Sequence, residues 1–413
     1  MTLFEEPAPK VDATAPAADC PGDALPLSGI RVVDFGHTVM GPCCSMLLAD
    51  LGAEIIKIEP ALGGDPTRNL RGFGMGYFGY FNRNKKSLAV DLKSEQGREI
   101  VCKLLATADV LVENFGPGTM DRLGLDYGSV AEMNPGIVYC ELKGFMAGPY
   151  ENRPALDEIV QMMSGLAYMT GPVGQPLRAG TSVVDIVGGM FGMLGVLLAL
   201  KERDQTGKGK HVKATLFETA VFLMGQHLCY ASLSSEPVPP MPARTSAWSI
   251  YEIFQTADDQ SLFVGIISDR HWERFCAEFE LLYLFQREDL RTNNARIAAR
   301  PTLVPEVMRV VRTLTLQDAA ARLERAGIPF APVSRPEDLF EDRHLQATGN
   351  LQDSRLPDGR SIRTPRLPLQ YGGWHPGLRS EPPAIGASTE GMLDELGYSA
   401  AEIDKLLNLG VVR

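Results

Sequence analysis

Basic residues are in the minority in this 413-residue chain. Lys and Arg number 40 against 51 Asp and Glu, so the formal net charge is −11. Proteins that bind nucleic acids present a basic face, and we therefore expect no nucleic-acid partner. Binding of small anionic ligands is still possible, because a protein with a negative net charge can contain local clusters of basic residues.

Motifs for metals and redox cofactors are missing as well. The seven cysteines are scattered, without the CxxC or Cys/His spacing of a zinc site, so we expect no bound metal. After the first expected strand, Gly36 and Gly41 are separated by four residues and do not form the GxGxxG that binds dinucleotides. The glycines between 72 and 79 follow no strand and indicate a flexible loop. No permanently bound cofactor is expected.

Hydrophobic runs of membrane-spanning length are also lacking. The most apolar segment, Ile186 to Leu200, is interrupted by glycines and ends at Lys201, short of the about 20 residues that span a bilayer. The first residues lack the basic start and apolar stretch of a signal peptide. We therefore expect a cytoplasmic protein with reduced cysteines and no membrane contact.

The chain does contain a regular alternation of strands and helices. Its length predicts two domains, and 45% hydrophobic residues is ordinary for a globular protein. The expected elements are strands at 30–35, 54–58, 88–91, 110–113 and 137–142 and helices at 43–51, 94–107 and 126–133. This alternation predicts an α/β fold with a large, doubly wound, Rossmann-like parallel sheet. Strands at 251–255 and 262–267, with helices at 269–279 and 316–326, predict a smaller α+β domain.

Five blocks of sequence resemble the class III coenzyme A transferase family. They keep the family's order and spacing from about residue 28 to residue 220, and a weaker likeness continues to the end. The blocks are DFGHTVMGPCCSMLLADLGAEIIKIEP from Asp34, FNRNKKSLAVDLKSEQGR from Phe81, ADVLVENFGPGTMDRLGL from Ala108, NPGIVYCELKGF from Asn134 with RPALDEIVQMMSGLAYMTG from Arg153, and LLALKERDQTGKGKHV from Leu197.

The resemblance implies an interlocked homodimer, in which two subunits thread through each other. It also implies that the N-terminal segment and the C-terminal tail together build the large domain. We expect a disordered tail at 1–27, the N-terminal part of the large domain at 28–228, a linker at 229–245, the small domain at 246–335, and a return segment at 336–413 that completes the large domain.

The resemblance further implies that CoA moves from an acyl-CoA to a carboxylic acid through an aspartyl anhydride and an aspartyl-CoA thioester. Asp157 matches the family's nucleophile, and such a nucleophile must also serve as a leaving group. Pro154 predicts that a helix begins nearby, where its dipole favours an anion. Gln161 lies on the same helical face, whereas Glu158 points about 100° away. The alternative interpretation is a helix-terminus carboxylate without a catalytic role.

CoA carries phosphates and an adenine, so its site needs cations and backbone donors. The resemblance matches the following residues to CoA-facing positions: Lys85, Lys86 and Arg122 near the phosphates, Asn114 and Phe115 in the nucleotide pocket, and His37 near the thiol. The two lysines are also compatible with a solvated surface. Lys143 agrees with the lysine of formyl-CoA transferase, and it either holds an acidic substrate or thiolate, or pairs with Glu141 or Asp157.

The sequence departs from formyl-CoA transferase at Val39, at Pro60 and around Gly265, which argues against oxalate specificity. Lys143, Arg178 and Arg244 offer cations for a dicarboxylate such as succinate.

Three alternatives stay open. A racemase or epimerase of the same superfamily typically has a histidine where this chain has Leu156, and proton abstraction needs an acid/base pair. The others are an intramolecular CoA transferase and an inactive CoA-binding regulatory protein.

Overall fold

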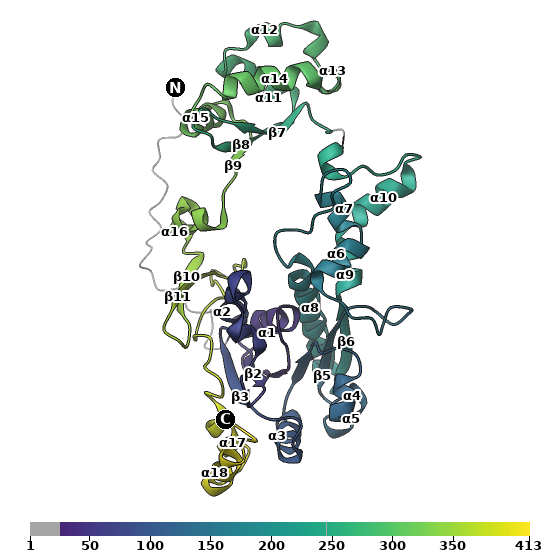
Figure 1. Ribbon diagram of the computed structural model, residues 1–413, viewed down its shortest axis with the longest axis vertical. Helices are drawn as coiled ribbons and strands as arrows, with labels where there is room; N and C mark the ends of the chain where they lie inside the picture. Colours follow the sequence, from purple (N-terminus) through teal and green to yellow (C-terminus); the bar gives the residue numbers. More distant parts are fainter. Residues whose placement is uncertain (1–24, 245) are drawn as a thin grey trace. The chain divides into compact units, whose positions relative to one another are not determined.

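The computed structural model describes residues 25–244 and 246–413, and the chain forms two compact units (Figure 1). The large unit joins the N-terminal part, as far as residue 242, to residues 344–413, and the small unit comprises residues 243–343. Most of the expected tail, 1–27, lies outside the described residues. The expected linker, 229–245, begins inside helix α10 (Gly225–Leu233), because proline first interrupts the chain at Pro237.

A parallel sheet of six strands organises the large unit. The strand order is β3-β2-β1-β4-β5-β6, and every neighbouring pair is parallel. The strands are β1 (Arg31–Asp34), β2 (Glu54–Glu59), β3 (Lys85–Ala89), β4 (Val110–Glu113), β5 (Val138–Lys143) and β6 (Lys210–Thr215). This is the doubly wound order, so the predicted α/β fold is confirmed.

Helices cover both faces of this sheet. One face packs against α1 (Met40–Asp50) and α8 (Val183–Thr206). The other packs against α3 (Glu95–Leu105), α5 (Tyr127–Met133), α17 (Thr389–Glu395) and α18 (Ala400–Asn408). The two apolar cores follow from the strands, whose successive side chains point to opposite faces.

The C-terminal segment returns to the N-terminal part of the large unit. The amide of Asp91 donates to the carbonyl of Val411 at 2.8 Å, and the amide of Arg413 donates to the carbonyl of Ala89 at 3.1 Å. Nearby, the side chain of Asn84 donates to Gly377 and accepts from the amide of Ser380. The end of the chain is therefore held by backbone contacts beside β3.

Two segments of the large unit differ from expectation. The glycines from 72 to 79 were expected to form a flexible loop, but they lie in a 3₁₀ helix (Gly72–Gly76) and in α2 (Tyr77–Phe81). Gly79 packs so closely against the leucine at 356 and the isoleucine at 362 that a Cβ atom there would lie 2.7 Å from the leucine. The Pro- and Gly-rich region after residue 340 contains an unforeseen hairpin, β10 (Leu351–Arg355) and β11 (Ser361–Pro365).

Helix α8 is longer than the apolar run in the sequence indicated. Its 24 residues satisfy the length and composition of a membrane-spanning helix, so the expectation that no segment reaches that length is wrong. Only 39% of the residues in its most apolar window are buried, and they include Gly188, Gly189 and Gly192, which pack against α1 and β5.

The small unit is an antiparallel sheet covered by helices. Its sheet has the order β7-β8-β9, with β7 (Ile250–Gln255), β8 (Ser261–Ile266) and β9 (Phe330–Pro332). Helices α11 (Asp269–Glu278) and α15 (Leu316–Ala326) agree with expectation. Helices α12 (Leu282–Phe285), α13 (Asn293–Ala298) and α14 (Arg300–Val311) were not foreseen. Pro305 inside α14 obscures the helical pattern, since proline usually ends a helix.

The remaining helices of the large unit lie between its strands and after β6. They are α4 (Thr119–Leu123), α6 (Asp157–Met163), α7 (Leu166–Thr170) and α9 (Leu216–Leu223). Helix α16 (Arg343–Thr348) follows the small unit.

The close contact between α1 and α8 predicts a stability effect. A Cβ atom on Gly189 would lie 2.8 Å from the carbonyl oxygen of Met40, and such overpacking costs about 1–3 kcal/mol. We expect Gly189→Ala to lower the urea midpoint of unfolding. The control is Gly391→Ala in α17, where no atom lies within 4 Å and alanine gains about 0.5–1 kcal/mol. An unchanged midpoint for Gly189→Ala would show that the two helices have room to separate.

Candidate active site

A cavity of about 270 Å³ opens at the carboxyl ends of the central strands. It lies beside the loops that follow β1 and β4, where the strand order reverses and doubly wound folds bind their ligands. Five of the residues singled out from the sequence line it together: His37, Asn114, Phe115, Lys143 and Asp157. They come from four separate parts of the chain, and only the folded sheet brings them together.

Asp157 is the first residue of α6, and its side chain is buried. One carboxylate oxygen accepts hydrogen bonds from the amides of Val184 at 2.9 Å and Asp185 at 3.1 Å. These amides belong to the first turn of α8, where helical N–H groups lack partners within the helix. Asp157 therefore lies at two helix N-termini, of which the sequence indicated only its own.

Gln161 connects Asp157 to the segment that precedes α8. Its side-chain amide donates to the other carboxylate oxygen of Asp157, as its position one helical turn later predicted. Its carbonyl oxygen accepts from the amide of Ala179 at 2.8 Å. Gln161 is completely buried, so both of its contacts fix the orientation of Asp157.

The loop after β1 is held from both sides. Gly36 donates its amide to Asp34 and accepts from the ammonium of Lys57, both at 2.7 Å. The side chain of Asn114 accepts from the amide of His37 at 2.9 Å and donates to its carbonyl at 3.0 Å. These four hydrogen bonds fix the backbone that carries the imidazole.

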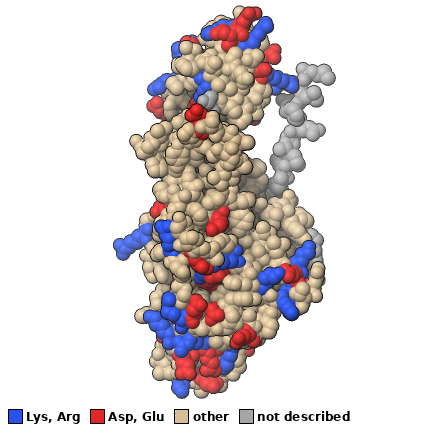
Figure 2. Space-filling model, turned by 90° about the vertical axis from the view of Figure 1, so that its right-hand side faces the viewer, with Lys and Arg blue, Asp and Glu red and all other residues tan. Residues whose placement is uncertain are grey.

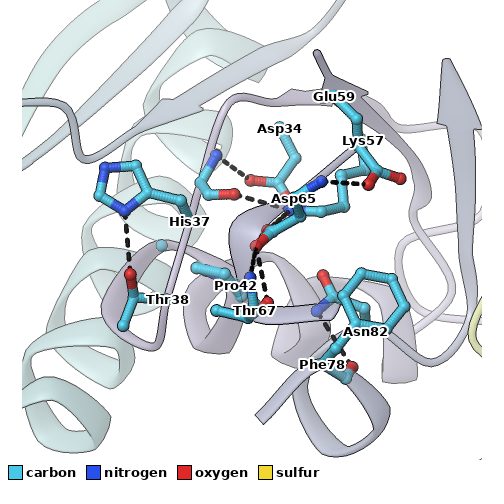
Figure 3. A network of polar contacts seen from close by, with 12 residues as sticks. Asp34, His37, Thr38, Pro42, Lys57, Glu59, Asp65, Thr67, Phe78 and Asn82 are labelled. Atoms are coloured by element: carbon cyan, nitrogen blue, oxygen red, sulfur yellow. Dashed lines mark hydrogen bonds and ion pairs between the residues drawn. The ribbon is translucent and has the colours of Figure 1, made fainter. Parts of the chain in front are cut away.

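The imidazole of His37 points away from the buried carboxylates of Asp34 and Asp65 (Figure 3). Its Nδ1 lies 3.1 Å from the hydroxyl of Thr38, and its ring lies 5.5 Å from that of Phe115. Burial lowers the pKa of His37, although the nearby Asp65 opposes the shift. At neutral pH the ring is therefore an uncharged hydrogen-bonding group.

Lys143 forms one ion pair that was expected, with Glu141, and a shorter one with Glu113 that was not. Its ammonium lies 2.5 Å from Glu113 and 3.7 Å from Glu141, and it donates to the carbonyl of Phe115 at 2.8 Å. The sequence had offered Glu141 or Asp157 as partners. Burial raises the pKa of Glu113, and the charge of Lys143 opposes that shift. Lys143 is therefore already neutralised by a carboxylate within the protein.

Lys85 lies in the interior, away from the cavity. Its ammonium donates to Asp34 at 3.0 Å, Ser45 at 2.8 Å and Asn82 at 3.0 Å. Burial lowers its pKa to about 8, and Asp34 opposes the shift. This position corrects the expectation that Lys85 faces a phosphate, since its donors are used inside the protein.

The other two expected phosphate contacts are on the surface. Lys86 is half-exposed and lies 2.5 Å from Glu54. Arg122 is exposed in α4 and donates to the hydroxyl of Thr119 at 2.9 Å. Neither lines the cavity that contains Asp157.

Two residues that line the cavity were not identified from the sequence. One cation that was expected to bind substrate is instead in an ion pair within the protein. Arg153 lines the cavity, and its guanidinium lies over the ring of Tyr150 at 4.9 Å. Asp185 also lines it, and burial followed by the charge of Asp157 raises its pKa to about 7. Arg178, expected to be a spare cation, forms an ion pair with Glu158. The RPALD spacing could have drawn attention to Arg153, whereas no local signal connects Asp185 with Asp157.

Among residues 25–244 and 246–413, no group of three or more His, Cys, Asp or Glu side chains is arranged to hold a metal ion.

Several known proteins that are similar to this chain are named CoA-transferases. Residues 27–389 match the family described as CoA-transferase family III. The succinate–glutarate CoA-transferase of Agrobacterium fabrum is 33% identical, covering 86% of this chain and 93% of that protein. The acetyl-CoA:oxalate CoA-transferase of Acetobacter aceti is 36% identical, covering 84% and 90%.

The fold is shared with a solved structure of a CAIB/BAIF family protein from Brucella suis. The two have a TM-score of 0.82 and 29% sequence identity, and the match covers 90% of this chain and all of that one. Together with the family match over most of its length, this similarity shows that the chain is a class III CoA-transferase, a member of CoA-transferase family III.

Proposed function

We propose that this enzyme transfers CoA from an acyl-CoA to a free carboxylic acid through a covalent intermediate on Asp157. The observation that carries the proposal is the buried carboxylate of Asp157, which lines the cavity and accepts two backbone hydrogen bonds from α8. A carboxylate suits this reaction because it can attack a thioester and later depart again.

The proposed reaction begins when Asp157 attacks the thioester carbonyl. The C–S bond breaks, and a mixed anhydride forms together with free CoA. CoA then attacks the carbonyl carbon of Asp157, which releases the first acid and leaves an aspartyl-CoA thioester. The second acid enters by the same two steps in reverse.

The two α8 amides have a specific use in this sequence. When CoA attacks the carbonyl carbon of Asp157, negative charge develops on the oxygen that faces Val184 and Asp185. Backbone donors held in place before the reaction stabilise such a charge without reorganising. The first turn of α8 therefore supplies an oxyanion site for the nucleophile's own carbonyl group.

The rival reactions fit this cavity less well. A racemase needs an acid/base pair next to the thioester, and the position before Asp157 is occupied by the exposed Leu156. An inactive CoA-binding protein would not require a buried carboxylate with such donors. Transfer between two carboxylates of one molecule uses the same groups and stays an alternative.

Replacement of Asp157 tests the nucleophile. We expect Asp157→Ala to retain less than about a tenth of the wild-type rate of CoA exchange, equivalent to a barrier increase above about 1.4 kcal/mol. Hydroxylamine should trap an acyl group on Asp157 in the wild type only. Glu158→Ala is the matched control: Glu158 is exposed and paired with Arg178, so substantial activity should remain. Equal rates for wild type and Asp157→Ala would exclude the proposed intermediate.

We also propose that one of the acids is a dicarboxylate. The relatives named above act on succinate, glutarate or oxalate. Of the cations named from the sequence, Lys143 is paired with Glu113 and Arg178 with Glu158. Arg153 lines the cavity four residues before Asp157, and its guanidinium has no carboxylate partner in the described part of the chain. It is therefore the cation we assign to the second carboxylate.

Arg153→Gln tests this assignment. A hydrogen bond to a charged group is worth about 1.5–3 kcal/mol, so kcat/KM for glutarate should fall by roughly 10- to 150-fold. The value for butyrate, which lacks the second carboxylate, should change little. Arg309→Gln is the control, because that guanidinium is exposed and paired with Glu306 in the small unit. An equal loss for glutarate and butyrate would show that Arg153 does not recognise the second carboxylate.

The other residues that the sequence matched to CoA-facing positions are those we assign to the binding of CoA itself. We propose that His37, Asn114 and Phe115 contact CoA in the cavity that contains Asp157. Arg122 and Lys86 stay as proposed contacts for its phosphates, because both are accessible to solvent. Lys85 is not included, since its ammonium is enclosed by protein donors and acceptors.

We further propose that the protein is an interlocked homodimer, with a largely apolar helical face of the large unit covered by the partner. Figure 2 shows a broad area with few charged side chains around helices α6, α7, α9 and α10. Its exposed apolar side chains are Ile159, Met162, Tyr168, Phe222, Leu228, Tyr230 and Leu233. Exposed apolar areas of this extent mark interaction sites.

Sedimentation tests the homodimer. We expect a dimer down to nanomolar concentration, because threaded subunits must unfold in order to part. Tagged and untagged protein mixed in native buffer should form no hybrid, whereas the same mixture refolded from denaturant should form one. A folded monomer at micromolar concentration, or rapid exchange without denaturant, would contradict the interlocked arrangement.

A further inference from the structure

The side chain of Asp185 is a further carboxyl group of the cavity, beside Asp157. Its backbone amide donates to Asp157 at 3.1 Å, while its carboxyl group lines the same cavity. No donor from residues 25–244 or 246–413 forms a hydrogen bond with that carboxyl group. Asp185 is the third residue of α8, and acidic residues are common in the first turn of a helix because the helix dipole stabilises their charge. Asp185 is partly buried and lies beside another carboxylate, which is unusual for such an acid, because water normally solvates the charge.

The charges around Asp185 favour its protonated form. Burial is the main cause of its raised pKa, the charge of Asp157 on α6 adds to it, and Arg178 from the preceding loop opposes it. The other ionisable groups nearby are Cys43 of α1, which interacts with the charge of Asp185, and His37, Lys143, Glu151 and Arg153, which line the same cavity. Lys143 and Glu151 have ion-pair partners of their own. Two neighbouring carboxyl groups in a confined site do not both ionise easily, and Asp185 is the one whose pKa is raised.

We infer that Asp185 is a proton donor and acceptor for the sulfur of CoA during the formation and breakdown of the acyl intermediate on Asp157. This inference rests on the proposed nucleophilic role of Asp157. It adds a second catalytic residue, in the same cavity, that acts on the leaving group and not on the carbonyl.

The proton balance of the two half-reactions is consistent with this role. When the carboxylate of Asp157 attacks the thioester, the C–O bond forms, the C–S bond breaks, and the sulfur takes the proton of Asp185. When CoA attacks the intermediate, the thiol returns its proton to Asp185 as the S–C bond forms and the carboxylic acid leaves as its anion. No other reactant is needed, and each cycle restores the protonation of Asp185.

Acylation of Asp157 also removes its negative charge in the step in which the sulfur of CoA needs a proton. The carboxylate of Asp157 holds the proton on Asp185 while the nucleophile is free. Once Asp157 becomes an uncharged anhydride, this repulsion disappears and Asp185 gives up its proton more readily. An ordinary thiol has a pKa of about 8.5, so transfer from Asp185 to the departing thiolate is favourable.

The pH dependence of CoA release tests the inference. The donor is whichever of succinyl-, glutaryl- and butyryl-CoA the wild type turns over fastest, and the first release of thiol is measured by rapid mixing. Asp185 is protonated below about pH 7, so the wild-type rate should be highest there and fall as the pH rises to 9. In Asp185→Asn the rate at pH 6 should be about 10- to 100-fold lower, and the fall with pH should disappear.

A measurement of stability provides a readout that is independent of activity. Folding raises the pKa of Asp185, so between its ordinary and its raised pKa the folded protein holds a proton that the unfolded chain has released. The free energy of unfolding of the wild type should therefore decrease from pH 5 to pH 8. Asp185→Asn carries no titrating group there and should lose less stability over the same range. This comparison also shows whether the variant is folded.

The outcomes separate this inference from the proposed function. Parallel pH profiles of CoA release in wild type and Asp185→Asn would overturn the role of Asp185 while leaving Asp157 as the nucleophile. A wild-type release rate that does not fall between pH 6 and 9 would overturn it even if the variant does not fold. Absence of any CoA release or hydroxylamine trapping in the wild type would instead contradict the proposed function.

Discussion

The close packing of α8 against α1 is the constraint on which the site depends. Gly189 lets the two helices approach until their backbones almost touch, since even a Cβ atom would lie 2.8 Å from a carbonyl oxygen of α1. That approach brings the free amides of Val184 and Asp185 to the carboxylate of Asp157. A buried carboxylate without such donors would cost several kcal/mol in desolvation. The glycines of α8 therefore make the burial of the nucleophile possible.

Buried charges beneath the loop after β1 serve a second positioning task. Lys57 pairs with Asp65 at 2.7 Å and also holds the carbonyl of Gly36, while Lys85 pairs with Asp34, which holds the amide of the same glycine. Buried ion pairs contribute little net stability, because desolvation offsets their attraction. Their geometry is nevertheless specific. In this protein they fix the backbone of a loop whose next residue faces the cavity.

Much of the large unit was predictable, because its strands and helices follow local periodicities. The parallel sheet was expected from the alternation of short apolar runs with amphipathic helices, and it was found. Helix α14 and the hairpin of β10 and β11 were missed because their local sequence lacks such a periodicity. Pro305 interrupts the helical pattern of α14, and the hairpin lies in a Pro- and Gly-rich region, so tertiary packing stabilises both. The fold alone does not specify a reaction; the side chains of the cavity and the similarity to CoA-transferases do.

The sequence by itself determined the α/β class and the placement of Asp157 and Gln161 on one helical face, because both follow from spacings of a few residues. Tertiary structure alone decided that Lys85 is an internal cation, that Lys143 pairs with Glu113, and that Asp185 lies beside Asp157. These contacts join segments about 30 residues or more apart, as Lys143 and Glu113 do across neighbouring strands. Local periodicity carries no information on such approaches, since they depend on which helices and strands pack together.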